Sequence, residues 1–256
     1  SEEILIPKFL NLYMDDLDTV GISIVPLGGR HVNHFWKLLT HLNIPFITLL
    51  DLDTEREGGG WGRIKYAITQ LIENGVEKSK LLTVKNGRVL SDEELNDMHT
   101  WQEYKFIDGW IEMLERFDVY YSNPLDIDFL MIESFLNAYL KTLEKNEGPL
   151  IKIKDSDKQK RIQELDEGEK NTKEYQERID SDVKRTLKKN GGNGDTYTDV
   201  QRELMIWYNY FFLNRGKPVT HLQALNYVSE DLLKANSPSV FINMADKIRK
   251  ILNIGE

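Results

Sequence analysis

Cysteine is absent from the 256-residue sequence. Disulfides, thiolate metal sites and a cysteine nucleophile are therefore excluded, and any bound metal must take oxygen or imidazole ligands. Such ligands favour hard cations such as Mg²⁺ or Mn²⁺. No apolar run approaches the roughly 20 residues of a transmembrane helix, and the first residues lack the pattern of a signal peptide. We therefore expect a cytoplasmic protein with no membrane partner.

Excess positive charge is also lacking, because the formal net charge is −9 at pH 7. This argues against a domain that holds nucleic acid simply by being basic. It does not exclude a nuclease, because a carboxylate-rich metal site contributes negative charge that bound divalent ions offset. With 40% hydrophobic residues, the chain can bury one large core, or a core and a smaller satellite.

Hydrophobic periodicity predicts an α/β fold. The predicted strands cover 20–27, 44–50 and 117–122. The predicted helices cover 2–14, 31–42, 61–73, 219–233 and 240–252. A further helical stretch is predicted to begin at 91–94, which has capping-box spacing. Because strands alternate with helices over the first half, we expect a parallel sheet flanked by helices.

The pattern changes at about residue 129, after which no strand-like run is found until the last forty residues. Residues 151–189 are dominated by charge and predict a solvated helix or a partly ordered arm, with a dedicated binding surface as the less favoured alternative. We therefore expect three parts: an α/β core over 1–128, a mostly helical, charge-rich insertion over 129–212, and a return to the core with closing helices over 213–256.

Two aspartate pairs, Asp51/Asp53 and Asp126/Asp128, follow two of the predicted strands. Side chains two apart in a strand point the same way, about 6–7 Å apart, so such a pair can flank a metal ion. Open α/β sheets bind ligands at these carboxyl ends. One Asp-x-Asp pair can equally cap a helix, but its repetition favours a metal site, because four buried carboxylates are costly without a cation. The alternative is that the pairs are exposed and unrelated.

These features resemble the Toprim domain of the OLD (overcoming lysogenization defect) nucleases, the group that includes the nuclease of the Gabija defence system. Ser1-Glu2 looks like the tail of the first Toprim motif, Glu-Gly-x-Ser-Glu, and the Leu-Asp-Leu-Asp run at 50–53 looks like its later strand end. The runs Ser-Asn-Pro-Leu-Asp-Ile-Asp-Phe at 122–129 and Gly-Lys-Pro-Val at 216–219 resemble the OLD group. The resemblance covers about 1–65, 117–135 and 205–235.

The resemblance implies a DNA endonuclease or nickase that hydrolyses phosphodiester bonds with two Mg²⁺ or Mn²⁺ ions. It makes these residues metal ligands or carboxylates that support the ligands: Glu2, Asp51, Asp53, Asp126 and Asp128. Glu2, Asp51 and Asp126 would be catalytic together with Lys217, the basic residue near the scissile phosphate. Glu3 takes the place of Glu2 if the motif alignment shifts by one residue.

The resemblance also implies partners. It predicts DNA as the substrate and an N-terminal ABC-type ATPase domain in a longer chain, of which this would be a C-terminal fragment. Because the first glutamate of the motif would precede Ser1, we expect the fragment to be weak or inactive. Whether the protein forms a homo-oligomer is left open.

Other residues have competing interpretations. The basic groups that would hold DNA are Arg30, Arg63, Lys65 and the cluster at 184–189. Glu55 and Glu57 are more typical of a solvated loop than of a metal site, and His31, His34 and His41 of core packing or a helix surface. Gly58 to Gly60 lack the following Lys-Ser/Thr of a phosphate loop. An isolated lysine such as Lys217 is usually an exposed loop residue.

Two other function classes remain. The main alternative is a non-catalytic, degenerate Toprim module for partner binding or assembly. A different Toprim activity, such as a topoisomerase or primase, is less favoured because no companion domain is recognisable. A rise in melting temperature with divalent ions would separate a metal site from the module.

Overall fold

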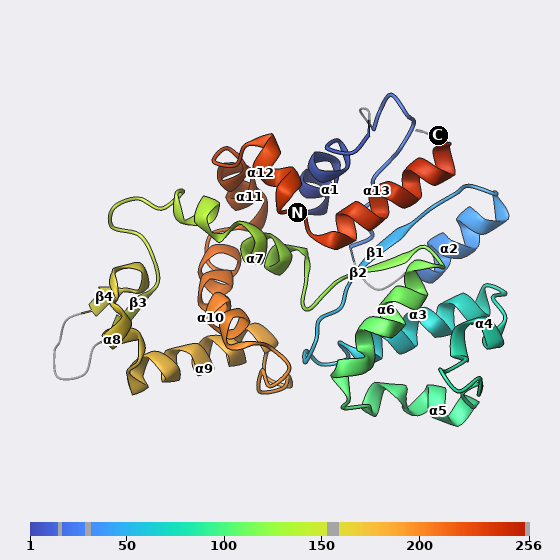
Figure 1. Cartoon of the computed structure of the whole chain (residues 1–256), viewed down its shortest axis with the longest axis horizontal. Coiled ribbons are helices and arrows are strands. Elements are labelled where there is room, and N and C mark those ends of the chain that lie inside the picture. The colour runs from blue at the N-terminus through green and yellow to red at the C-terminus, as the bar shows by residue number, and fades with distance from the viewer. Residues whose placement is uncertain (15–16, 29–31, 153–158, 254–256) are drawn as a thin grey trace.

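The computed structural model describes residues 1–14, 17–28, 32–152 and 159–253. Figure 1 shows a mixed α/β chain with two short sheets, one lying between helices and the other at the outer left edge. Among the described residues, no helix is both long and apolar enough to cross a membrane.

The α-helices are α1 (Glu2–Leu10), α2 (Val32–His41), α3 (Trp61–Glu73), α4 (Lys78–Leu82), α5 (Asp92–Asp97), α6 (Ile107–Glu115), α7 (Ile127–Leu140), α8 (Glu167–Lys170), α9 (Lys173–Leu187), α10 (Asp199–Tyr208), α11 (Lys217–Leu225), α12 (Glu230–Ala235) and α13 (Ser239–Leu252). The shorter turns are η1 (Met98–Thr100), η2 (Tyr104–Phe106), η3 (Ile162–Glu164) and the π-helical η4 (Asn209–Leu213). The strands are β1 (Thr48–Asp51), β2 (Val119–Ser122), β3 (Leu150–Lys152) and β4 (Gln159–Arg161).

Local sequence patterns predicted the bounds of α3 and the start of α5 correctly. α3 has the bounds that its periodicity predicted and is followed by Gly75 at a φ of 94°, a left-handed conformation that glycine adopts without strain. α5 begins with the predicted capping box, in which Ser91 and Glu94 each bond the other's backbone N–H. The predicted helix at 2–14 ends at Leu10, and the one at 219–233 is divided into α11 and α12.

β1 and β2 form a parallel pair, in register from Thr48 opposite Val119 to Asp51 opposite Ser122. The parallel pairing was predicted, and because the strands run the same way, their carboxyl ends lie at one edge. The predicted strand at 20–27 is wrong, since its residues lie in no strand. Its side chains do alternate between half-buried and exposed, but a ladder also needs a neighbour with free backbone groups, and the described sheet joins β1 to β2 alone.

Two further predictions need correction. β1 begins at Thr48 rather than Ile44, and Pro45 has no N–H to give to a ladder. The region 129–212 was expected to hold no strand, yet β3 and β4 form a short antiparallel hairpin, and the described part of the last forty residues is helical instead. The charge-rich segment is also less solvated than expected, because α9 buries one side chain per turn, at Tyr175, Ile179, Val183 and Leu187.

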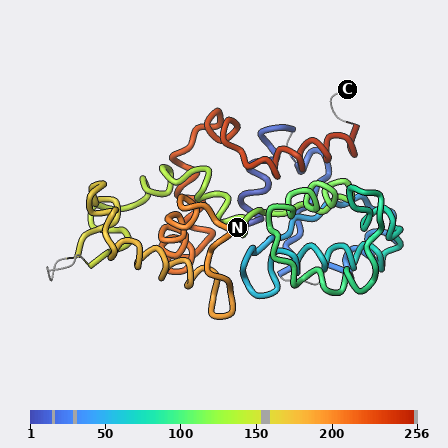
Figure 2. Tube along the Cα trace, turned by 60° about the horizontal axis from the view of Figure 1, so that its bottom comes forward, coloured from blue at the N-terminus to red at the C-terminus, as the bar shows by residue number. Residues whose placement is uncertain are grey.

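The hydrophobic core consists of two clusters on either side of β2. One gathers buried residues between Val32 and Tyr121, and the other gathers α1, α7 and α9 to α13. Neighbouring residues of a strand face opposite sides, so Tyr120 belongs to the second cluster and Tyr121 to the first. Figure 2 shows the corresponding bodies, one cyan to green and one yellow to red. The division at 128 and 212 stays a prediction.

Candidate functional site

The loops that follow β1 and β2 are hydrogen-bonded to each other. At the strand ends, Ser122 Oγ donates to Asp51 Oδ1 over 2.9 Å. Beyond them, the amide of Asp53 donates to the carbonyl of Leu125 at 2.8 Å. This continued pairing carries the first aspartate pair toward the second.

Arg56 joins the two pairs. Its Nη1 lies 2.8 Å from Asp53 Oδ1 and 3.1 Å from Asp126 Oδ2. Its Nη2 donates to Tyr208 Oη at 3.0 Å, and its Nε donates to the carbonyl of Thr186 at 3.1 Å. Burial works to lower the pKa of the guanidinium, but Tyr208 and Asp126 raise it above its usual value. Arg56 is therefore a permanent internal cation.

Asp53 carries a second arginine. Arg63, on the first turn of α3, donates to Asp53 Oδ2. Burial works to raise the pKa of Asp53, but the hydrogen bond from Arg63 and the charge of Arg56 lower it overall. The loop is tight, because a Cβ on Gly59 would lie 1.8 Å from the Asp53 carbonyl oxygen. The glycine run at 58–60 thus lets α3 approach the aspartate loop closely.

Asp126 is the N-cap of α7. Its Oδ1 accepts from the amide of Phe129 at 2.9 Å, and its Oδ2 accepts from Tyr208 Oη at 2.6 Å. Burial and the neighbouring Asp128 raise the pKa of this carboxyl, against the lowering effect of Arg56. The capping interpretation of the pair is therefore correct for Asp126, and it coexists with membership of the acidic centre.

Asp128 is bound by residues from the far end of the chain. Lys217 Nζ lies 2.5 Å from Oδ2, and His221 Nε2 lies 2.8 Å from Oδ1, which also accepts from Ser1 Oγ at 2.6 Å. Burial works to raise the pKa of Asp128, but His221 and Lys217 hold it well below its usual range. The lysine that the OLD pattern indicated thus lies at the acidic centre, and 42% of its side-chain surface is exposed.

Asp51 differs from the other three aspartates. Among the described residues, no ion pair reaches its carboxylate. Burial raises its pKa to about 7, and the charges of Asp126, Asp53 and Glu2 add to the effect, against a hydrogen bond from Ser122. Glu2 and Glu3 are both exposed, but of the two it is Glu2 that lines the same cavity as Asp51, of about 800 Å³. This favours Glu2 over Glu3 as the glutamate of the site.

The carboxylates are the type of ligand that a hard cation prefers, but most of them are not arranged to hold one. Oxygen ligands are those that Mg²⁺ and Mn²⁺ prefer. Yet Asp53, Asp126 and Asp128 already bind side-chain donors, and the described part of the chain holds no group of three or more acidic or imidazole side chains placed to hold an ion. Asp51, with Glu2 beside it, fits a cation best because it has no basic partner.

Several candidates lie elsewhere. Glu55 and Glu57 bind the loop at 190–196 instead of the acidic centre. His34 and His41 are exposed on α2. Lys65 donates to the carbonyl of Asn96, and the basic residues of the cluster at 184–189 are exposed. Arg30 and His31 lie outside the described residues.

Three members of the site were not predicted: Arg56, Tyr208 and His221. Arg56 stands three residues after Asp53, a spacing that a loop can close into an ion pair. His221 stands four residues after Lys217, so both point the same way from α11. Tyr208 has no signal in the sequence beyond its aromatic surroundings, since α10 meets Asp126 only through the tertiary fold.

A parallel sheet edge with converging acidic side chains is compatible with a Toprim-like α/β fold. In agreement, residues 1–53 match the family model described as overcoming lysogenization defect protein-like, TOPRIM domain. The predicted OLD-like Toprim relationship is confirmed on this segment, which includes Asp51 and Asp53, while membership of the Gabija group stays a prediction. No curated protein and no solved structure matches the chain. A Toprim domain suggests a metal-binding function related to nucleic acids.

Proposed function

We propose that this chain is the Toprim part of a divalent-metal-dependent DNA endonuclease or nickase that hydrolyses phosphodiester bonds. The observation that carries the proposal is the convergence of Asp51, the Asp126/Asp128 pair and Lys217 from three separate segments. Acidic groups beside a solvent-accessible lysine suit a phosphodiester, because the acids can hold a cation and the lysine can bind a phosphate oxygen.

Each residue has a role in this proposal. Asp51 and Glu2 would hold a divalent ion, which when bound supplies a Lewis acid for the phosphate and an activated water. A second ion, as in the two-metal mechanism of the family, would have to compete with Arg56 for Asp53 and Asp126. Lys217 would add positive charge where the phosphate becomes more negative in the transition state.

Nicking of supercoiled plasmid in Mg²⁺ or Mn²⁺ tests the proposal. A chain extended with Glu-Gly before Ser1 should produce open-circular DNA, and in that chain Asp51→Asn and Lys217→Met should each lower the rate about 100-fold or more. Lys78→Met is the matched control, since Lys78 pairs with Asp92 at the exposed surface and should leave the rate unchanged. Undiminished nicking by folded Asp51→Asn protein would contradict the proposal, as would absence of nicking by the chain extended with Glu-Gly.

A non-catalytic, degenerate Toprim module is the second candidate. It is favoured by one observation, the pairing of three of the four aspartates with basic side chains. A module of this kind would bind partners without nicking and would show no response to divalent ions. DNA as a ligand, an ABC-type ATPase as a companion domain and a homo-oligomeric state remain predictions under both functions.

A further inference from the structure

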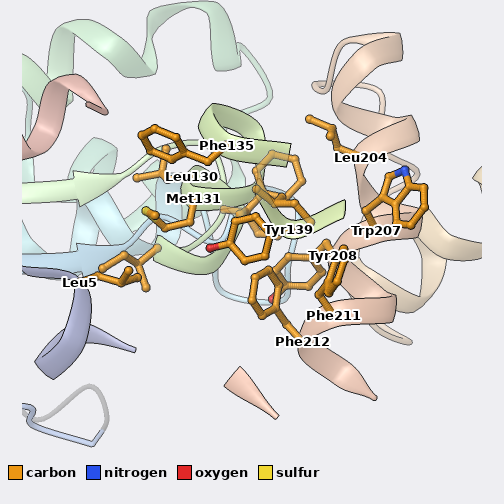
Figure 3. Packing of buried hydrophobic residues seen from close by; sticks show 14 of the residues in the cluster. Leu5, Leu130, Met131, Phe135, Tyr139, Leu204, Trp207, Tyr208, Phe211 and Phe212 are labelled. Atoms are coloured by element: carbon orange, nitrogen blue, oxygen red, sulfur yellow. The ribbon is translucent and has the colours of Figure 1, made fainter. Parts of the chain in front are cut away.

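His221 is a fully buried histidine in contact with the acidic centre. It lies on α11, one turn after Lys217, with 0% of its surface exposed. Its Nε2 is 2.8 Å from Asp128 Oδ1, and its Nδ1 is 2.6 Å from Tyr139 Oη. The imidazole stacks on Phe212, with ring centroids 4.8 Å apart. Figure 3 shows Tyr139 and Phe212 within the buried aromatic cluster.

The hydrogen bonds are compatible with one tautomer of the imidazole. Burial raises the pKa of the Tyr139 phenol well above its usual value, so its O–H stays protonated and can donate to Nδ1. In the tautomer that accepts this bond at Nδ1, the ring proton lies on Nε2, from where it can donate to Asp128. Both nitrogens are satisfied in one tautomer, which is the condition for a well-oriented imidazole.

The same bonds connect His221 to Lys217. Asp128 has one oxygen toward His221 and the other toward Lys217, at 2.8 and 2.5 Å. Asp128 and Tyr139 lie on α7, while Lys217 and His221 lie on α11. The chain Tyr139, His221, Asp128, Lys217 therefore ties the two helices and leaves the Asp128 carboxylate little freedom to rotate.

We propose that His221 is a positioning residue that fixes Asp128 and, through it, holds the Lys217 ammonium in place for the phosphate. This inference rests on the proposed function, because it gives Lys217 its role there. His221 is fully buried and does not meet the substrate. Its loss would let the carboxylate rotate and displace the ammonium, and a displacement of about 1 Å can lower a rate about 100-fold.

The test is the steady-state nicking kinetics of His221 variants in Mn²⁺. His221→Leu fills the space without an N–H and should lower kcat about 10- to 100-fold, with KM for plasmid changed less than about 3-fold. His221→Gln carries an amide N–H that reaches about as far as Nε2, and it should recover most of the lost rate. Tyr139→Phe removes the bond that selects the tautomer and should lower kcat by a smaller factor.

A double substitution separates positioning from general damage. If His221 acts through Lys217, adding His221→Leu to Lys217→Met should lower the rate no further than Lys217→Met alone. A further drop in the double variant, or His221→Gln as slow as His221→Leu with circular dichroism unchanged, would overturn the inference. If His221→Leu does not fold, Tyr139→Phe tests the inference instead. Full activity of Tyr139→Phe would then contradict the inference. These variants are made in the chain extended with Glu-Gly before Ser1, and inactivity of that chain without substitutions refutes the proposed function instead.

Discussion

Four aspartates lie close together in this protein, and side-chain cations offset most of their charge. Arg56 and Arg63 bind Asp53, Arg56 also binds Asp126, and Lys217 binds Asp128. Buried carboxylates repel one another strongly, so each of these pairs lowers a cost that burial creates. Within the described part of the chain Asp51 has no such partner, so burial and the neighbouring carboxylates raise its pKa, and it is the aspartate best suited to an external cation.

Arg56→Ala should be among the most destabilising substitutions in the chain. It removes four hydrogen bonds and leaves Asp53 and Asp126 buried without the cation they share. We expect a loss of about 3–5 kcal/mol in the free energy of unfolding, measured by urea denaturation. Lys78→Ala, which breaks an exposed pair with Asp92, should cost less than about 1 kcal/mol. Equal losses for the two variants would show that Arg56 does not stabilise the fold by pairing with Asp53 and Asp126.

Asp51 should make stability fall as pH rises. Its pKa is about 7 in the folded protein and near 3.8 when unfolded, so between these values the folded state binds the extra proton. Stability from this group is therefore present below about pH 4 and is lost as pH rises to about 7. Between pH 5 and pH 8 the unmodified protein should lose more free energy of unfolding than Asp51→Asn does, by on the order of 2 kcal/mol, as measured by urea denaturation at the two pH values. Parallel losses in both proteins would refute this assignment.

At the scale of elements, two loops hold the site together. The segment between β1 and α3 carries Asp53, Glu55 and Arg56, and it packs against the loop that connects α9 to α10. The Glu55 carboxylate accepts from the amides of Gly194 and Thr196, at 2.6 and 2.7 Å, and from Thr196 Oγ1 at 2.6 Å. The approach requires glycine, since a Cβ on Gly192 would lie 2.1 Å from Glu55 Oε2. Glu55 therefore connects the edge of the sheet to the loop between α9 and α10.

Glu55→Ala should release the loop at 190–196. Because three donors lose a charged acceptor, we expect a loss of about 1.5–3 kcal/mol in stability and faster hydrogen exchange at the amides of Gly194 and Thr196. Glu57→Ala is the matched control, since Glu57 accepts one exposed bond from Asn190. Unchanged exchange in the Glu55 variant would mean that other contacts hold the loop.

At the scale of the whole molecule, the acidic centre lies where the two hydrophobic clusters meet. β2 contributes Tyr121 to one cluster and Tyr120 to the other, and the site follows directly from the end of this strand. Arg63 comes from the α3 side, whereas Tyr208, Lys217 and His221 come from the helical side. The arrangement of the site therefore depends on both clusters being folded.

Divalent ions should raise the melting temperature if the site binds them. A ligand that binds only the folded state stabilises it by about 1.4 kcal/mol at ten times its dissociation constant, which corresponds to about 3–5 °C for a chain of this size. Thermal melts in Mn²⁺ and Mg²⁺ should show this shift for the unmodified protein and lose it in Asp51→Asn. A flat response of the unmodified protein would favour the non-catalytic module.

Local patterns in the sequence were sufficient for many parts of this protein. Hydrophobic periodicity and capping residues predicted α3 and the start of α5, and the two Asp-x-Asp runs predicted which strand ends carry acids. Such features depend on residues within a few positions of one another, where helix and turn preferences act. The absence of cysteine likewise limited metal ligands to oxygen and imidazole before any fold was known.

Only the tertiary structure decided how the acids are neutralised. Arg56, Tyr208 and His221 meet the aspartates across separations of up to 93 residues, and no local preference encodes such contacts. The strand expected at 20–27 failed for the same reason, because a ladder needs a partner that periodicity alone does not supply. Burial, which only the packed core creates, raises the pKa of Asp51 and encloses His221 beside Asp128.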